Sequence, residues 1–163
     1  MNYLIPAAVT LLVLGLSSFL PVSEKVEITQ VVDGDTINME NDTVRFLGVD
    51  TPETSAISEN NPSDYGLENE SETVDCLDRY GEQASNFVEN NTFEEITLVS
   101  DRISDKRGDY DRRLAYIRSE TDLNRKLVVN GLARVYPSDF SRKNEFYMWE
   151  RIARENRRGL WSC

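Results

Sequence analysis

The chain contains no histidine, and this absence restricts its chemistry before any motif is considered. Histidine is the commonest general base near neutral pH and the commonest protein ligand of transition metals. Cysteine is almost as scarce, with two residues in a chain of 163, so a cysteine-based metal site would lack the ligands to complete it. Proton transfer and cation binding must therefore depend on carboxylates, water or arginine.

Lysine is also rare, because 14 of the 18 basic residues are arginine. The net charge of −11 argues against a general affinity for nucleic acid, but the charges are unevenly spread. Residues 50–95 carry 13 acidic groups and 1 basic group, whereas residues 96–163 carry 10 acidic and 15 basic groups. The basic C-terminal part could therefore hold a polyanion while the acidic middle faces solvent or a metal ion.

The long apolar run from Tyr3 to Val22 stands apart from the rest of the chain. A run of about 20 such residues is enough to span a bilayer. No lysine or arginine precedes it and no clear cleavage site of small residues follows it, so a cleaved signal peptide and an N-terminal membrane anchor are both open. We expect residues 1–23 to direct export and residues 24–163 to form one extracellular domain, secreted or held on the outer face of the membrane by this segment alone.

The two cysteines, Cys76 and Cys163, are expected to pair in an exported domain, since disulfides persist outside the reducing cytoplasm. Two free thiols are the alternative, because the sequence does not show that the two Cα atoms lie close enough for a bond. A disulfide would tie the last residue of the chain to the start of a predicted helix.

Two short motifs carry most of the chemistry: Asp33-Gly34-Asp35-Thr36 and Arg45-Phe46-Leu47-Gly48-Val49-Asp50-Thr51-Pro52-Glu53. The residues between them alternate in polarity as strands do, and Asn41-Asp42 is a turn signal. This pattern predicts a hairpin in which Asp35 opens one strand and Asp50 lies just past the other. Residues at the open end of a hairpin lie side by side, so both carboxylates would be within reach of one cation.

These residue types suit the hydrolysis of a phosphodiester. A hard divalent cation such as Ca²⁺ or Mg²⁺ prefers oxygen ligands, which Asp35, Asp50 and the carbonyl of Thr51 can supply. The guanidinium of Arg45 can pair with a phosphate through two parallel hydrogen bonds, and Glu53 can polarise a water molecule. Either motif alone is better explained by a tight turn or a capped helix start, because short motifs often occur by chance. Both motifs at this spacing, with an arginine between them, favour the functional interpretation.

The chain resembles the thermonuclease (staphylococcal nuclease-like) family in these two motifs and in three further ones. The additional matches are Tyr110-Asp111-Arg112-Arg113-Leu114-Ala115-Tyr116, Asn130-Gly131-Leu132-Ala133 and Gly159-Leu160-Trp161. All five occur in family order from about residue 26 to the C-terminus, and the first two are the most specific.

The resemblance implies a Ca²⁺-dependent phosphodiesterase that acts on DNA and RNA and leaves 3′-phosphate ends. By position in the motifs it implies three metal ligands and three catalytic residues. The metal ligands are Asp35, Asp50 and Thr51, and the catalytic residues are Arg45, Glu53 and Arg112.

The chain departs from the family pattern at two places. Asp111 stands where the family usually has glycine before the second arginine, which puts the geometry of Arg112 in question. The family's base-stacking tyrosines are expected after residues 131–133, where this chain has Tyr136. A tyrosine of the hydrophobic core is an equally open interpretation of Tyr136.

The remaining pattern predicts an oligonucleotide-binding (OB) barrel, because five short strands interrupted by a helix suit that architecture. We expect strands at residues 26–32, 36–39, 43–48, 96–99 and 112–118, and helices at 74–90, 122–128 and 141–156. Gly159 should end the last helix, and Trp161 should pack back onto the barrel. The resemblance implies the same fold, a mainly β, α+β domain with a five-stranded Greek-key barrel and three helices.

Residues 54–73 form an acidic segment that is longer than most loops. A second cation site, a lid and a solvated insertion are all consistent with its composition, and a solvated insertion is favoured.

Two other functions compete with the enzyme. A non-catalytic OB module would bind nucleic acid without needing both arginines and the metal ligands, and a calcium-binding surface protein would need the carboxylates alone. We expect a monomer in each case. If the enzyme interpretation is right, Arg45→Ala should abolish cleavage and spare calcium binding.

Overall fold

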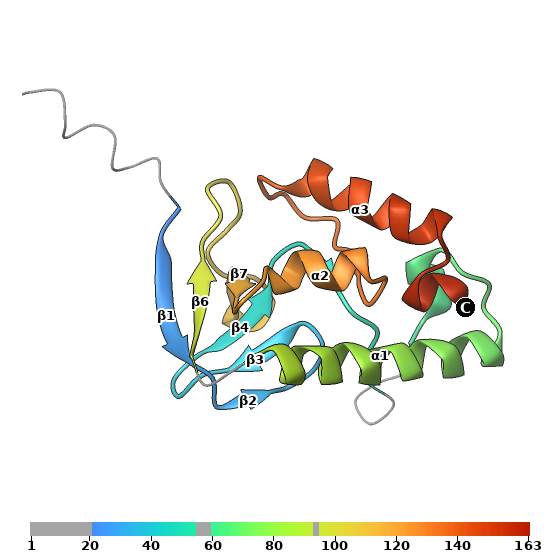
Figure 1. Cartoon of the computed structure of the whole chain (residues 1–163), viewed down its shortest axis with the longest axis horizontal. Helices are drawn as coiled ribbons and strands as arrows, with labels where there is room; N and C mark the ends of the chain where they lie inside the picture. Colours follow the sequence, from blue (N-terminus) through green and yellow to red (C-terminus); the bar gives the residue numbers. More distant parts are fainter. Residues whose placement is uncertain (1–20, 55–59, 93–94) are drawn as a thin grey trace, which may run out of the picture.

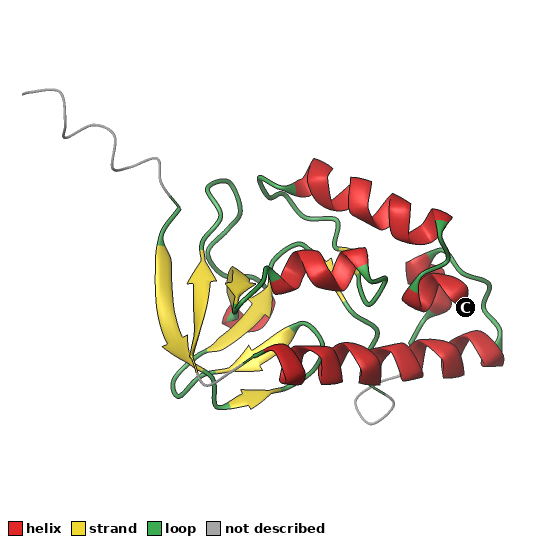
Figure 2. Ribbon diagram, in the orientation of Figure 1, coloured by secondary structure: helices red, strands yellow, loops and turns green. Residues whose placement is uncertain are grey.

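The computed structural model describes residues 21–54, 60–92 and 95–163. The strands are β1 (Ser23–Glu27), β2 (Gln30–Val31), β3 (Thr36–Asn38), β4 (Thr43–Phe46), β5 (Val49–Asp50), β6 (Glu95–Val99), β7 (Arg113–Arg118) and β8 (Arg134–Val135). The helices are α1 (Ser71–Asn91), α2 (Leu123–Val129) and α3 (Lys143–Glu155), with short 3₁₀ turns at Pro62–Tyr65, Asp109–Asp111 and Gly159–Ser162. Figure 2 shows the strands gathered at one end of the molecule and the helices extending from them.

The first predicted strand is in fact two strands separated by a bend. β1 pairs with β6 and β2 pairs with β3, so two halves of one extended segment lie at opposite ends of the strand order β1-β6-β7-β4-β3-β2. This arrangement wraps the sheet into a barrel, as Figure 1 shows for β1 beside β6 and β2 beside β3. β4 and β7 run parallel, whereas the other pairs of this sheet are antiparallel. The topology and the three helices confirm the predicted OB-type α+β fold.

The barrel interior is filled by side chains that alternate along the strands. Ile37 in β3 and both Val44 and Phe46 in β4 are at most 1% exposed. Ala84 and Val88, one turn apart on α1, join the same core. Full burial of an aliphatic or aromatic side chain contributes roughly 1.5–3 kcal/mol, so this shared core fixes the position of α1 against the barrel.

The start of α2 follows the local signals in the sequence. Asp122 is the N-cap residue, and its side chain accepts a hydrogen bond of 3.0 Å from the backbone N–H of Arg125. Gly131 follows the helix at φ 68°, a left-handed conformation that glycine adopts without strain. The predicted short helix at residues 122–128 is confirmed, with its first residue acting as the cap.

The C-terminal turn packs differently from the prediction. Trp161 is buried, but it lies with Tyr65, Leu77 and Leu160 in a second small core beside α1 and not on the barrel. The guanidinium of Arg154 stacks over the Trp161 ring at 3.7 Å from its centre. The 3₁₀ turn Pro62–Tyr65 supplies one wall of this core, which the sequence pattern did not reveal.

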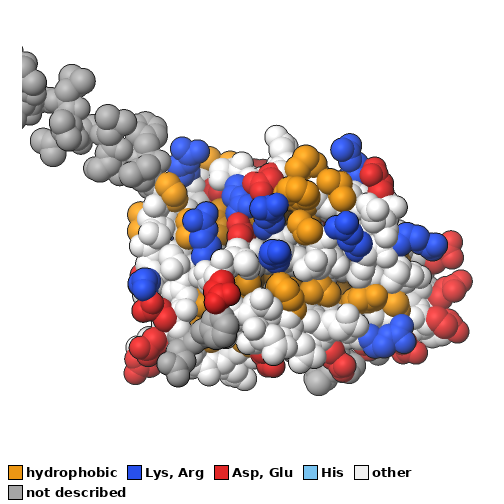
Figure 3. All heavy atoms as spheres, in the orientation of Figure 1, with side chains coloured by type: hydrophobic (Ala, Val, Ile, Leu, Met, Phe, Trp, Pro, Cys, Tyr) orange, Lys and Arg blue, Asp and Glu red, His pale blue; other side chains and the backbone are white. Residues whose placement is uncertain are grey.

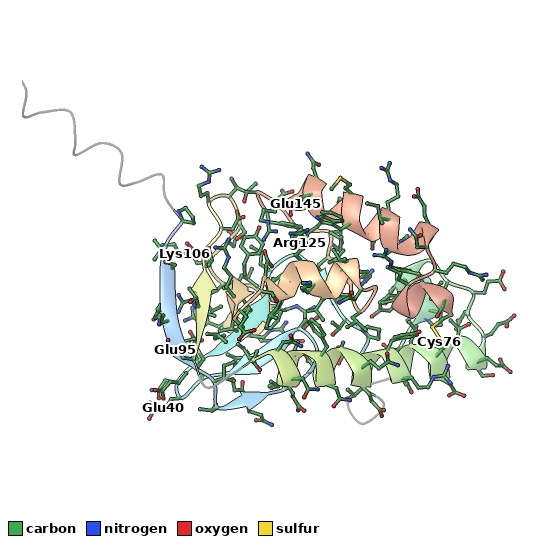
Figure 4. The ribbon with its side chains drawn as sticks, in the orientation of Figure 1. Glu40, Cys76, Glu95, Lys106, Arg125 and Glu145 are labelled. Carbon is green, nitrogen blue, oxygen red and sulfur yellow. A yellow bond between two sulfur atoms is a disulfide. The ribbon has the colours of Figure 1, made fainter. Side chains whose placement is uncertain are left out.

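The predicted disulfide between Cys76 and Cys163 is present, with Cα atoms 5.9 Å apart. It joins the first part of α1 to the last residue, and Figure 4 shows Cys76 next to the C-terminal turn. The C-terminal core and the disulfide therefore hold the same two parts of the chain together.

The acidic segment is packed only in part. Asn60, Pro62 and Tyr65 are buried, so full solvation is wrong for these three residues, whereas residues 66 and 68–72 are exposed as a solvated insertion would be. Residues 55–59 lie outside the described residues, as does nearly all of the apolar segment predicted to direct export. Among the described residues, no helix has the length and apolarity required to cross a membrane.

Candidate active site

The turn before β3 is held tightly against α1. The Asp33 side chain accepts a hydrogen bond of 2.9 Å from the backbone N–H of Asp35. A Cβ atom on Gly34 would lie 2.5 Å from the Cβ of Ala84 in α1 and 2.9 Å from the Thr51 side chain. Glycine is therefore required here for the turn to approach the helix, and this approach places Asp35 at the start of β3.

Asp35 is buried, with 2% of its surface exposed. One carboxylate oxygen accepts hydrogen bonds from the Thr36 hydroxyl at 3.0 Å and from Arg45 at 2.6 Å. The other oxygen accepts a hydrogen bond of 3.0 Å from the backbone N–H of Thr51. Burial raises the pKa of Asp35, and the neighbouring Arg45 opposes this shift.

Arg45 bridges the two carboxylates that the predicted hairpin brings together. Its guanidinium lies 2.6 Å from the Asp35 carboxylate and 2.5 Å from that of Asp50. The hairpin register pairs Thr36 with Arg45, which is why Asp35 lies beside the arginine. The structure thus places the residues predicted as metal ligands side by side, with Arg45 between their side chains.

Arg134 is a member of this cluster that the sequence analysis missed. It is paired with Asp50 in the β5–β8 ladder, and its Nε donates a hydrogen bond of 2.8 Å to the second oxygen of Asp50. It also donates to the carbonyl of Asp64, and its guanidinium lies 5.1 Å from the centre of the buried Tyr65 ring. The nearby motif at residues 130–133 pointed to this region of the chain, but the pairing of two-residue strands has no sequence signal.

A pocket of about 350 Å³ opens beside this cluster and contains all three predicted catalytic residues. Arg45, Glu53 and Arg112 line it together with Tyr110 and Tyr136. Burial raises the pKa of Glu53, and the charge of Asp33 adds to this effect, whereas Arg45 and Arg112 act in the opposite direction. The predicted base and the two predicted phosphate ligands therefore share one solvent-accessible cavity.

Arg112 follows a strained turn at the edge of this pocket. Tyr110 and Asp111 have φ values of 58° and 59°, in the left-handed region that costs a residue with a Cβ atom about 1–2 kcal/mol. Asp111 adopts this conformation where the family usually has glycine. The Arg112 Nε donates a hydrogen bond of 3.2 Å to the Asp109 carbonyl, and the side chain still lines the pocket.

Tyr136 is on the pocket wall and 38% exposed, so the interpretation as a core tyrosine is wrong. The Arg45 guanidinium lies 5.8 Å from the centre of its ring. A base-stacking role for Tyr136 stays a prediction. Tyr110, at 93% exposed, is a second aromatic residue on this pocket that the sequence analysis did not single out.

The oxygen atoms around Arg45 suit a hard divalent cation. Asp33, Asp35, Asp50 and Glu53 bring four carboxylates to one region, where Arg45 pairs with Asp35 and Asp50 and Arg134 pairs with Asp50. The remaining excess of negative charge contributes to the raised pKa of Asp35. In the described part of the chain, no three acidic or cysteine side chains are already grouped as a metal site, because Arg45 lies between Asp35 and Asp50. Donor chemistry and the excess of carboxylates over arginines therefore fit a hard divalent cation such as Ca²⁺.

Charges are unevenly spread on the face drawn in Figure 3. Lys and Arg side chains are most frequent in its upper and middle parts, whereas Asp and Glu are most frequent at the lower-left and right-hand edges. This distribution agrees with the separation between an acidic middle and a basic C-terminal part seen in the sequence.

Comparisons with known proteins agree with these features. The family model described as "Staphylococcal nuclease homologue" matches residues 43–163. A thermonuclease of Staphylococcus intermedius is 31% identical over 142 residues, covering 82% of this chain and 74% of that protein. Endonuclease YncB of Bacillus subtilis is 32% identical over 146 residues, covering 84% and 61%. The uncharacterized protein MJ1439 of Methanocaldococcus jannaschii is 38% identical over 148 residues, covering 83% and 70%.

The fold and the site define an OB-type barrel with a pocket suited to a phosphate group. The chain belongs to the staphylococcal nuclease-like family, as its motifs predicted. The relatives include a protein named thermonuclease and one named endonuclease, which supports hydrolysis of phosphodiester bonds in nucleic acid as the general activity.

Proposed function

We propose that the protein is a Ca²⁺-dependent nuclease that hydrolyses DNA and RNA and leaves 3′-phosphate ends. The observation that carries the proposal is one pocket lined by Arg45, Glu53 and Arg112, in which Arg45 also contacts the carboxylates of Asp35 and Asp50. A cation, two guanidinium groups and a carboxylate base are together what attack of water on a phosphodiester requires.

Glu53 is the residue that accepts the proton of the attacking water. Burial and the charge of Asp33 raise its pKa above that of an ordinary glutamate, which makes the carboxylate a stronger base than an exposed one. Its position on the pocket wall gives it access to a water molecule inside the cavity.

Arg45 and Arg112 bind and neutralise the phosphoryl oxygens as negative charge grows during the attack. A guanidinium has five N–H donors, and Arg45 uses two of its nitrogens on Asp35 and Asp50, so further donors remain for the substrate. Arg112 has one hydrogen bond, to the Asp109 carbonyl, among the described residues. Departure of the 5′-oxygen then leaves the phosphate on the 3′ side.

Asp35, Asp50 and the carbonyl of Thr51 are the groups that would hold Ca²⁺. When bound, the cation supplies positive charge next to the phosphoryl oxygens. The carboxylates hold it in place, and the Thr51 N–H already orients one oxygen of Asp35 by a hydrogen bond of 3.0 Å.

Cleavage of labelled single-stranded DNA and RNA by the purified protein, with Ca²⁺ or with a chelator, tests the proposal. We expect cleavage with Ca²⁺ alone and 3′-phosphate ends by mass spectrometry. Binding without cleavage under every condition would instead support a non-catalytic OB module.

Arg112→Ala distinguishes an enzyme from a calcium-binding surface protein. Loss of one donor to the transition state should lower kcat by about 100-fold or more without loss of the fold. Arg102→Ala, a change of an exposed arginine in the preceding loop, is the matched control and should keep full activity. Equal activity of the two variants would contradict the assigned role of Arg112.

We also propose that the protein acts outside the cytoplasm. The apolar run at residues 3–22 and the Cys76–Cys163 disulfide support this, because disulfides persist in oxidising compartments. Digestion of the protein on intact cells by added protease, compared with lysed cells, is the test.

A further inference from the structure

Asn60 holds the backbone of Glu53 through both the N–H and the carbonyl of that residue. Its side-chain oxygen accepts a hydrogen bond of 2.9 Å from the Glu53 N–H, and its side-chain nitrogen donates one of 2.8 Å to the Glu53 carbonyl. Asn60 is only 7% exposed, so these bonds are shielded from competing water. Asparagine is one of the few side chains that can donate and accept in this way.

Asp78 in α1 sets the orientation of the Asn60 amide. Its carboxylate accepts a hydrogen bond of 2.7 Å from the same side-chain nitrogen that donates to Glu53. The Asp78 carboxylate can only accept, so the Asn60 amide must turn its nitrogen toward Asp78. In this orientation the nitrogen can donate to the Glu53 carbonyl and the oxygen can accept from the Glu53 N–H. These hydrogen bonds, here called the Asn60 clamp, link Asp78 in α1 through Asn60 to the Glu53 backbone.

The helix α1 also packs directly against the backbone of Pro52 and Glu53. A Cβ atom on Gly81 would lie 2.4 Å from the Glu53 carbonyl oxygen and 2.7 Å from that of Pro52. Gly81 and Asp78 are three positions apart in α1 and so lie on the same face of the helix. The Glu53 backbone is therefore confined between the helix surface and the Asn60 side chain.

We propose that Asn60, oriented by Asp78, is a positioning residue that fixes Glu53 for proton transfer. This inference rests on the proposed role of Glu53 as general base. Transfer of a proton in the transition state depends steeply on geometry, and a displacement of about 1 Å can cost 100-fold in rate. Asn60 touches the backbone of the base and not the pocket, so it acts on the chemical step and leaves substrate binding to the arginines.

The test compares Asn60→Ala with Asn61→Ala. Asn61 is the neighbouring asparagine, which caps the 3₁₀ turn at residues 62–65 and makes no bond to Glu53, so it is a matched control. We expect N60A to lower kcat at least tenfold with KM changed by less than twofold, and N61A to keep both values. Amide hydrogen exchange should show faster exchange of the Glu53 N–H in N60A alone.

Asp78→Ala provides a second variant that preserves the buried asparagine. It should lower kcat less than N60A, and the double variant should be no worse than N60A, because both changes remove the same clamp. Should N60A fail to fold, D78A with Glu53 amide exchange carries the test.

The results that overturn this inference differ from those that overturn the proposed function. An active wild type with an N60A variant that is folded and equally active would overturn the positioning role alone. A change confined to KM would do the same. A wild type that cleaves no nucleic acid would overturn the proposed function and, with it, the role of Asn60 in catalysis.

Discussion

Arg45 is the residue on which the site depends most, because it is the cation between two largely buried carboxylates. Its side chain is 17% exposed, and that of Asp35 is 3% exposed. Removing one partner of a buried ion pair leaves an uncompensated charge and typically costs about 3–5 kcal/mol. The Arg45→Ala variant suggested by the sequence would therefore disturb Asp35 as well as cleavage, so it cannot separate catalysis from calcium binding.

We expect Arg45→Ala to lower the free energy of unfolding by about 3 kcal/mol or more, and Arg45→Lys to lower it less. Lysine keeps the positive charge but cannot contact both carboxylates through a planar fork, so its activity should still fall. Urea denaturation of the two variants at neutral pH measures the difference. Equal stability of both variants would mean that geometry, and not charge, holds the site together.

Asp101 gives the protein a specific response to acid. Burial acts to raise its pKa, but hydrogen bonds from Ser141, the Ile103 N–H and Tyr116 outweigh it and lower the pKa to about 2. An unfolded aspartate titrates near ~3.9, so the stabilisation is fully present above that pH and is lost as the pH falls toward 2.

The comparison of wild type with Asp101→Asn isolates this contribution from the other carboxylates. We expect a constant difference in the free energy of unfolding between pH 5 and 7 and a shrinking difference between about pH 4 and pH 2. Chemical denaturation across this range is the measurement. A difference that grows on acidification would contradict the assignment.

The site residues whose positions could be predicted from the local sequence pattern are those on the hairpin. Asp35, Arg45 and Asp50 follow from strand alternation and a turn signal, so their proximity was predictable. Arg134 and Asn60 were not, because Arg134 reaches the site through pairing across 84 residues and Asn60 through contact with a helix. Such contacts form only when the whole barrel has folded, so a short stretch of sequence does not predict them.

At the scale of elements, the turn that links β4 to β5 is packed closely against Phe140. Gly48 has φ 76°, and a Cβ atom there would lie 2.6–2.9 Å from three atoms of the Phe140 ring. The ring is itself buried, so it cannot move aside into solvent. Both the backbone conformation and the close approach of Phe140 therefore require glycine.

Gly48→Ala should destabilise the fold by about 2–4 kcal/mol, since it combines left-handed strain with overpacking. Gly66→Ala is the control, because Gly66 has φ 69° and its nearest neighbour would be the end of the Arg154 side chain at 3.7 Å. That variant should lose about 1 kcal/mol from strain alone. Thermal denaturation of both variants checks the comparison, and similar losses would argue that Phe140 relaxes.

The prediction of one continuous strand at residues 26–32 was wrong because the chain changes its pairing partner within this segment. Alternation of polarity indicates extended backbone but does not say where a strand changes its partner. β1 and β2 are both extended, yet the bend between them transfers the pairing from β6 to β3. The polarity pattern of one strand therefore does not predict how the barrel closes. The expectation of a closed barrel came from the family resemblance.

The whole molecule consists of the barrel core and the smaller C-terminal core of Tyr65, Leu77, Ala153, Leu160 and Trp161. The disulfide closes the second core, and the turn at residues 62–65 connects it to Arg134 and so to Asp50. The proposed catalytic pocket lies on the barrel side, where the lining residues belong to β4, β5, β7, the 3₁₀ turn Asp109–Asp111 and the loops around them. Loss of the disulfide should therefore affect stability more than the chemical step.

Replacing both cysteines by serine tests this separation. The disulfide spans 87 residues, and in the loop-entropy model a loop of this size stabilises by roughly 4–5 kcal/mol. The double variant should lose stability on this order in urea denaturation, while its kcat at a temperature where it remains folded should stay within about twofold of wild type. Adding reductant to the wild type should reproduce the shift, and it should leave the double variant unchanged. A large fall in kcat of the folded variant would show instead that the C-terminal core controls the pocket through Arg134 and Asp50.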